Sequence, residues 1–193
     1  MSIVSFIVIA IAFGIISLVT YSRCAAAVPP RLSAGLLTVI AVTAAQLAMY
    51  LVGIAIGNLL HLEALDNKEL YNTQNAYIAL GLIVIVVIKT IVPYLKRKHQ
   101  LPVFDITHFA PAASMAIATG LDIFLVGIAI GFVTPLRDNI LISIIPFVIS
   151  TLTLGFIGIM FGRQKVKIRP KRWIMVASLM MVVCAIAIAV NNS

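Results

Sequence analysis

Charged residues are scarce in this sequence. Only 20 of its 193 residues carry a formal charge, 14 basic and 6 acidic, which is 10% of the chain where a soluble domain has about 25%. Apolar residues make up 62%, and the mean hydropathy is +1.15. This balance excludes a soluble enzyme, a disordered chain and a nucleic-acid binder in water. We expect a compact membrane protein with several spans and no separate soluble domain.

Cysteines are few, and the usual catalytic motifs are missing. The two cysteines, Cys24 and Cys184, form no C-x-x-C pair, so we expect small buried or lipid-facing residues rather than metal or redox groups. The sequence holds no phosphate-binding loop, nucleophile elbow or H-E-x-x-H motif. His61, His99 and His108 are too dispersed to suggest a metal cluster. We therefore predict that the chain is not an enzyme and binds no permanent cofactor.

What the sequence does contain is six long apolar runs. Each is close to the ~20 residues with which a helix crosses the hydrocarbon core of a bilayer. Strands of a membrane barrel would alternate apolar and polar residues over ~10 positions, and these runs do not. The predicted fold class is an all-α polytopic membrane protein with six transmembrane helices, at Ile3–Ser22, Ser33–Leu60, Ala76–Leu95, Phe109–Val133, Ile140–Phe161 and Trp173–Val190.

Basic residues are distributed unevenly between the connections. Eleven lie in the first, third and fifth connections, and only Lys68 and Arg137 lie in the second and fourth. Because basic loops stay on the cytoplasmic side, this predicts a multi-pass protein with both termini outside. Lys89 lies near the inner end of the third run, from where its ammonium group can reach the interface. The net charge of +8 then reflects topology rather than a nucleic-acid partner.

The two halves of the sequence resemble each other. Ala10–Ile15 aligns with Ala116–Leu121 at an offset of 106 residues, and Gly53–Gly57 aligns with Gly158–Gly162 at an offset of 105. Three spans per half is an odd number, so the second copy must enter the membrane from the opposite side. Transporters with this plan bind their substrate near the membrane midplane, between the repeats. We predict a single transmembrane domain, 1–193, made of two inverted three-helix repeats at about 1–98 and 105–193.

Asp122 is the only acidic residue inside an apolar run, near the middle of the fourth. An ionised carboxylate there costs about 2.5–3.5 kcal/mol on insertion scales, so such a residue usually faces a cavity or a partner and is functional. The alternative is a protonated Asp122 that is hydrogen-bonded to a neighbouring helix. Thr119 precedes it by one turn on the same helical face. Both residues are candidates for the binding site of a transported substrate.

The second apolar run carries polar and small residues along one helical face. Thr43, Gln46, Tyr50, Gly53 and Gly57 are spaced by three or four residues. One interpretation is an interhelical packing face, in which G-x-x-x-G lets two backbones approach and Gln46 bonds across to another helix. The other interpretation makes Gln46 a ligand that lines a cavity. The sequence favours neither over the other.

Two further runs hold features of the same kind. Ser17 and Thr20 place hydroxyl groups on or near a small, polar stripe of the first run. Pro146 interrupts the fifth run and frees a backbone carbonyl, which is tolerated in lipid only where protein or water satisfies it. A kink beside a transport pathway and a simple packing bend are both compatible with this proline.

Several segments resemble a known family. Ala116–Asp122 (Ala-Ile-Ala-Thr-Gly-Leu-Asp), Val126–Phe132 and Gly158–Arg163 are similar to the bacterial manganese efflux pump family. That family belongs with the lysine-exporter-type transporters, which are six-helix proteins built from two three-helix repeats. The resemblance extends over nearly the whole chain, and it indicates a divergent member of this family. The family's first-repeat aspartate falls on Ile16, and a glutamate of some relatives falls on Pro93.

The resemblance implies a function and a site. It identifies the chain as a secondary transporter that exports a divalent cation, manganese, across the bacterial cytoplasmic (inner) membrane, with Mn²⁺ as cargo. Asp122 matches the acid of the family's second repeat, which is implicated in metal transport, and Gln46 matches a polar or acidic position. Manganese prefers several oxygen ligands in octahedral array. Thr119, Ser17 and Thr20 are therefore expected to complete the site with freed carbonyls and water, or a second protomer of a homodimer does so.

Two other functions are alternatives at this point. With one of two family acids absent, the site is less anionic, and an amino acid or other small solute is the alternative cargo. A transport-inactive membrane scaffold or subunit is the third interpretation. The expected partners in the main interpretation are the lipid bilayer and the cation.

Overall fold

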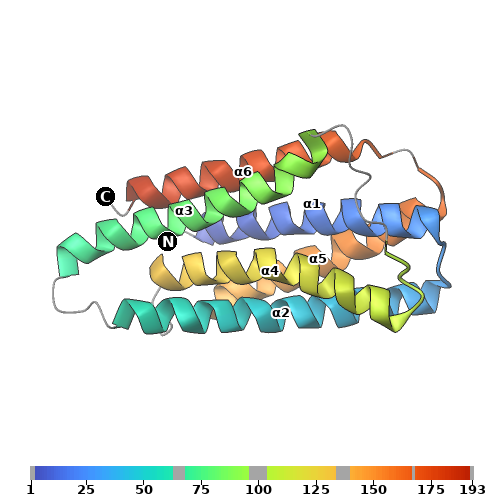
Figure 1. The fold of residues 1–193 in the computed structure, drawn as a ribbon, viewed down its shortest axis with the longest axis horizontal. Coiled ribbons are helices and arrows are strands. Elements are labelled where there is room, and N and C mark those ends of the chain that lie inside the picture. The colour runs from blue at the N-terminus through green and yellow to red at the C-terminus, as the bar shows by residue number, and fades with distance from the viewer. Residues whose placement is uncertain (1–2, 63–67, 96–103, 134–139, 167, 192–193) are drawn as a thin grey trace.

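The protein is a bundle of six α-helices, seen from the side in Figure 1. The structure is a computed structural model, and it describes residues 3–62, 68–95, 104–133, 140–166 and 168–191. Within these ranges there is no β-strand. The helices are α1 Ile3–Ala27, α2 Leu32–Leu62, α3 Lys68–Leu95, α4 Phe109–Val133, α5 Ile140–Arg163 and α6 Pro170–Asn191.

Each helix is long and apolar enough to cross a membrane, which confirms the predicted fold class. Their bounds lie within three residues of the predicted runs except at two points, of which the first is the end of α1 at Ala27, five residues after the predicted Ser22. Helix α3 begins at Lys68, eight residues before the predicted Ala76. Hydropathy detects only the apolar part of a helix, and the polar stretch Lys68–Asn75 belongs to the same helix. Pro93 and Pro146 both lie inside helices that continue past them.

Large apolar side chains are exposed on the outer faces of all six helices. Leu37 of α2 is 68% exposed, Ile88 of α3 is 55% exposed, and Leu179 of α6 is 65% exposed. In water an apolar surface of this extent would drive association, so these faces are suited to lipid tails. The chain is thus built as a multi-pass membrane protein.

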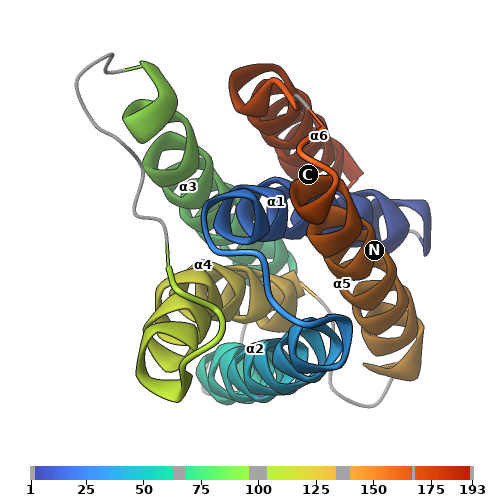
Figure 2. The same cartoon turned by 90° about the vertical axis from the view of Figure 1, so that its right-hand side faces the viewer.

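The helices pack as a closed ring of neighbours. Helix α1 contacts α5, α5 contacts α2, α2 contacts α4, α4 contacts α3, α3 contacts α6, and α6 contacts α1. Figure 2 shows the bundle end-on: α3 and α6 lie on one side of α1, and α2 lies on the opposite side. If α1, α2 and α3 change places with α4, α5 and α6 respectively, the same pairs of neighbours result. Inverted repeats require this pattern, and the inverted orientation of the two halves stays a prediction.

Glycines allow α2 and α4 to pack with their backbones in contact. A Cβ atom added to Gly53 or Gly57 would collide with the carbonyl oxygen of Phe124 or Ile128, and one added to Gly127 would meet the backbone of α2. Only residues without a side chain permit so close an approach of two helices. The close-packing interpretation of these glycine pairs is therefore confirmed.

A second glycine crossing joins α1 to α5. A Cβ atom on Gly158 would collide with the carbonyl oxygen of Leu18, and one on Gly162 with that of Ser22. Leu18 lies 106 residues before Phe124, the residue that Gly53 meets at the other crossing. The two crossings therefore use corresponding residues of the two halves at the offset that the sequence shows.

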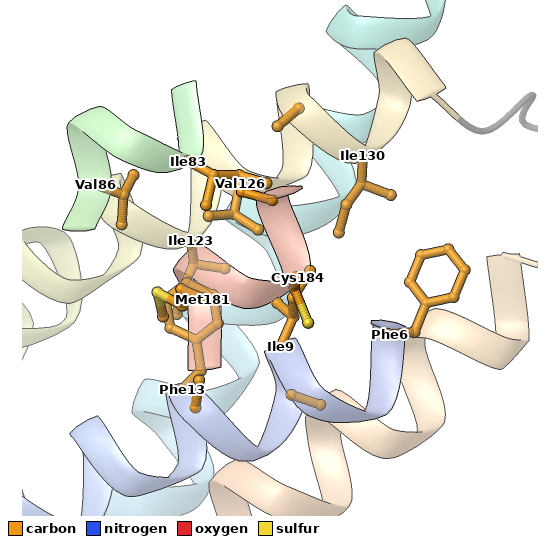
Figure 3. Packing of buried hydrophobic residues seen from close by; sticks show 14 of the residues in the cluster. Phe6, Ile9, Phe13, Ile83, Val86, Ile123, Val126, Ile130, Met181 and Cys184 are labelled. Carbon is orange, nitrogen blue, oxygen red and sulfur yellow. The ribbon is translucent and has the colours of Figure 1, made fainter. Parts of the chain in front are cut away.

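The largest buried apolar cluster has its centre where α1, α3, α4 and α6 meet. Both cysteines are buried free thiols, as predicted: Cys184 lies in this cluster, and Cys24 lies in a second one. Figure 3 labels the main members of the larger cluster, which are Phe6, Ile9, Phe13, Ile83, Val86, Ile123, Val126, Ile130, Met181 and Cys184.

Candidate functional site

Asp122 lies in the middle of α4 and is paired with a lysine. It is residue 14 of the 25 in this helix, and its Oδ1 atom lies 2.5 Å from Nζ of Lys89 on α3. The aspartate side chain is 23% exposed and the lysine side chain 49% exposed. The pair therefore spans the seam between α3 and α4, with the carboxylate as its more enclosed member.

The sequence predicts that the Lys89 ammonium can reach the inner interface, and in the structure this ammonium is paired with Asp122. Lys89 lies six residues before the last residue of α3, Leu95. Figure 1 shows that α3 ends well before the end of the bundle at which α1 ends and α4 begins. This offset of α3 places the Lys89 ammonium at the level of Asp122, with whose carboxylate it forms an ion pair.

Gln46 and Thr119 bridge α2 and α4 one turn away from Asp122. Nε2 of Gln46 donates a hydrogen bond of 2.8 Å to Oγ1 of Thr119, and that hydroxyl donates to the carbonyl of Met115, also at 2.8 Å. Gln46 is only 3% exposed. The interhelical hydrogen bond that the sequence left open as one of two alternatives is thus present. It places the amide of Gln46 beside Thr119, which precedes Asp122 by three residues on α4.

Ser17 and Thr20 lie apart from this group. Both are on α1, whose main neighbours are α5 and α6. The hydroxyl of Thr20 donates to the carbonyl of Ile16 in its own helix at 2.9 Å, and Ser17 is buried. Among the described residues no hydrogen bond joins either of them to α4. The structure therefore brings Gln46 and Thr119 together and pairs Asp122 with Lys89, and Ile16 is half-buried among apolar side chains.

The sequence contained a signal for Lys89 that the predicted site did not use. Lys89 is the only basic residue inside any of the six predicted apolar runs, as Asp122 is the only acidic one. Two lone charges of opposite sign within the membrane usually pair with each other. That rule makes Lys89 a candidate partner of Asp122, and the shift of α3 along α4 decides whether the two residues meet.

A groove of about 450 Å³ runs along α2 and the start of α4. Its wall is mostly alanine and other apolar side chains. The Thr38 hydroxyl at its edge donates to the carbonyl of the buried Ile106 at 3.2 Å. The lining residues are Ala34, Leu37, Thr38, Ala41, Val42, Ala45, Ile106, Thr107, His108, Ala112, Ala113, Ala116 and Ile117.

Asp105 orders the segment that leads into α4. Its Oδ1 atom accepts hydrogen bonds from the Thr107 hydroxyl at 2.5 Å and from the Thr107 backbone N–H at 2.9 Å. These two hydrogen bonds, the side-chain one foremost, hold the pKa of the Asp105 carboxyl below its usual value. Asp105 is thus an acid with a local structural role, outside the membrane-spanning helices.

Oxygen atoms are the donors that this region offers to a cation. Within the described ranges no three His, Cys, Asp or Glu side chains gather into a group that could hold a metal ion. The oxygen groups on this part of α2 and α4 are the carboxylate of Asp122, the hydroxyl of Thr119 three residues earlier, and the amide of Gln46. Such a set matches a cation that prefers oxygen, provided that water or backbone carbonyls complete the shell.

Comparison with known proteins identifies the family of the chain. The family model described as "Putative manganese efflux pump" matches residues 29–189, which is more than four-fifths of the sequence and includes α2 to α6 almost entirely. The match begins after α1, the helix that carries Ile16. Searches of curated proteins and of solved structures gave no match. Efflux pumps are transporters and not a class of enzyme, and this chain belongs to the manganese efflux pump family.

Proposed function

We propose that this protein exports a divalent cation, manganese, across the bacterial cytoplasmic membrane. One observation carries the proposal: the single carboxylate in the middle of a span, Asp122, lies within one turn of the hydrogen-bonded pair Gln46–Thr119. Ionisable residues at this depth mark the route of an ion in membrane transporters. The family of the chain supplies the identity of the ion.

Three oxygen donors on α2 and α4 support cation binding. They are the carboxylate of Asp122, the hydroxyl of Thr119 and the amide oxygen of Gln46, whose Nε2 atom is the one bonded to Thr119. Ser17 and Thr20 would join them only if α1 moved toward α4 during the transport cycle. Otherwise water, freed carbonyls or a second protomer would supply the remaining ligands that Mn²⁺ prefers.

The transport cycle would draw its energy from an ion gradient or from the membrane potential. The sequence holds no nucleotide-binding motif. A divalent cation carries two charges, and each elementary charge that crosses the membrane is worth about 2.3 kcal/mol per 100 mV. Export from a negative interior therefore needs exchange with another cation, and protons are the available coupling ion.

A zwitterionic solute such as an amino acid is the second candidate cargo. The close pair of Asp122 and Lys89 makes the site electrically neutral, with one charge of each sign. An amino acid carries a carboxylate and an ammonium group, which complement Lys89 and Asp122 respectively. This observation favours a zwitterion over a bare cation unless Lys89 leaves the site during binding.

Manganese retention in cells tests the main proposal. Bacteria that lack their own manganese exporter would be loaded with radiolabelled Mn²⁺ and supplied with wild type, Asp122→Asn, Asp105→Asn or an empty vector. We expect wild type and Asp105→Asn to lower the retained label, and Asp122→Asn to retain as much as the vector control. Asp105→Asn is the matched control, because it makes the same chemical change on an acid outside the spans.

Equal retention in all four strains, with each variant present in the membrane, would overturn manganese export. That outcome leaves the zwitterion transporter and the transport-inactive scaffold, which are separated by substrate screening in proteoliposomes. A stoichiometric protein partner together with no transport of any solute would establish the scaffold.

A further inference from the structure

We propose that Lys89 is a built-in competitor of the transported cation. Its ammonium group occupies Asp122 when the site holds no cargo, and cargo displaces it. This inference rests on the proposed function, because it takes Asp122 as a cation ligand. It adds a residue and a step that the predicted site did not contain.

The first support is the contact itself. Nζ of Lys89 lies 2.5 Å from Oδ1 of Asp122, which is hydrogen-bonding distance for a charged pair. The two residues come from different helices, 33 positions apart in the sequence, so the contact is not a by-product of one helical turn. Within the membrane each charge makes the other tolerable, because a lone charge of either sign is costly there.

The second support is the charge balance of a loaded site. The pair carries no net charge. A divalent cation on the same carboxylate would face the ammonium group a few ångström away, and the repulsion between charges of +2 and +1 is twice that between two unit charges. Cargo and ammonium therefore do not share Asp122, and binding of the one requires departure of the other.

The third support is the freedom of Lys89 to withdraw. Half of its side chain is exposed, whereas that of Asp122 is mostly enclosed. A lysine carries its charge on a flexible four-carbon stem, so Nζ can swing by several ångström without movement of α3. The helix ends six residues later, and the side chain can turn toward that end.

This exchange predicts opposite effects on binding and on turnover. Without Lys89 the cation meets a bare carboxylate and binds more tightly. After release, however, nothing neutralises Asp122, so release becomes slower. A lysine in this position therefore weakens binding of the cation and speeds the transport cycle, because its ammonium group replaces the departing cation at Asp122.

The experiment measures the dissociation constant of Mn²⁺ and the rate of Mn²⁺ transport for four proteins in lipid nanodiscs and proteoliposomes. They are wild type, Lys89→Met, Lys89→Arg and the matched control Lys171→Met, which removes an exposed lysine at the start of α6. We expect Lys89→Met to bind at least about tenfold more tightly and to transport more slowly. Lys89→Arg should bind no more tightly than wild type, and Lys171→Met should match wild type.

A second measurement uses the folded wild-type protein, in case Lys89→Met does not fold. An amine-reactive reagent is applied with and without saturating Mn²⁺, and modification of Lys89 is read by mass spectrometry. We expect Mn²⁺ to raise the reactivity of Lys89 and to leave that of Lys171 unchanged. Unchanged reactivity of Lys89 at saturating Mn²⁺ overturns the competition.

Asp122→Asn separates failure of this inference from failure of the proposed function. If Asp122→Asn binds Mn²⁺ as well as wild type does, the proposed cation site is wrong. If Asp122→Asn loses binding while Lys89→Met binds with the wild-type affinity, the site stands and the role of Lys89 is wrong.

Discussion

At the scale of single residues, the candidate site consists of two layers of polar contacts made by α4, the first with α3 and the second with α2. Asp122 points across the seam to Lys89 of α3, and Thr119, one turn earlier, is bonded to Gln46 of α2. An unpaired charge at this depth costs about 2.5–3.5 kcal/mol, so the pairing with Lys89 explains how the chain keeps an ionised group in the span. The second layer is neutral and holds its polar atoms by hydrogen bonds.

Thr119→Val tests the second layer. Valine has the shape of threonine but cannot accept the hydrogen bond from Gln46, so a buried amide donor loses its partner. We expect the free energy of unfolding in mixed micelles to fall by about 0.6–1.7 kcal/mol. Mn²⁺ binding should weaken as well, since one oxygen donor is lost.

Thr153→Val is the matched control for this change. The Thr153 hydroxyl is exposed, and it donates to Ile149 at 2.6 Å and to Ser150 at 3.3 Å, both within its own helix α5. This variant should cost less stability than Thr119→Val and leave Mn²⁺ binding unchanged. Equal losses at the two positions would show that the bond between α2 and α4 contributes nothing specific.

At the scale of helices, the glycine crossings determine how closely α2 and α4 approach. Gly127 lies against the backbone of α2 at Tyr50 and Gly53. Gly81 of α3, in contrast, has no heavy atom near the place of its missing Cβ. The two glycines therefore separate the effect of packing from the effect of helix propensity.

Gly127→Ala and Gly81→Ala make the same chemical change with opposite expected results. The added methyl at 127 has to push two backbones apart, and we expect a loss of about 1–3 kcal/mol in the free energy of unfolding. The methyl at 81 enters open space and favours the helix by up to about 1 kcal/mol. Equal unfolding free energies for the two variants would contradict the crossing described here.

Helices were predictable from the sequence because their cause is local. Continuous apolar runs define the spans, and the start of α3 was missed because its first turns are polar. The glycine pairs were predictable for a similar reason, since spacing alone puts them on one face. The partner of Asp122 was not found, because it depends on how far α3 is shifted along α4, which no local pattern records.

The candidate site was predicted only in part for the same reason. Gln46 and Thr119 face each other because the glycine crossing brings α2 onto α4 in this register. Ser17 and Thr20 have suitable chemistry, but α1 packs on α5 and α6. Residue type and span were thus readable from the sequence, whereas the neighbour of each span was not.

At the scale of the whole molecule, the distribution of charge should define the orientation in the membrane. The first and last described residues lie at the same end of the bundle, as an even number of spans requires (Figure 1). By sequence, eleven basic residues belong to the first, third and fifth predicted connections, against two in the second and fourth. We expect the end with both termini to face outward.

Cysteine labelling tests this orientation. Cys24 and Cys184 are buried, so the native chain should give little background. A membrane-impermeant maleimide should label Asn67→Cys, in the second connection, on intact cells. It should label Gln164→Cys, an exposed position after α5, only once the membrane is permeabilised. The reverse pattern would contradict the predicted orientation.

Mn²⁺ efflux from proteoliposomes that contain only the purified protein tests most directly whether Asp122 carries a divalent cation across the membrane. We expect wild type to release radiolabelled Mn²⁺ faster than empty liposomes, Asp122→Asn not to do so, and external amino acids to leave the rate unchanged. Release by Asp122→Asn at the wild-type rate, or no release by wild type at all, would contradict this expectation.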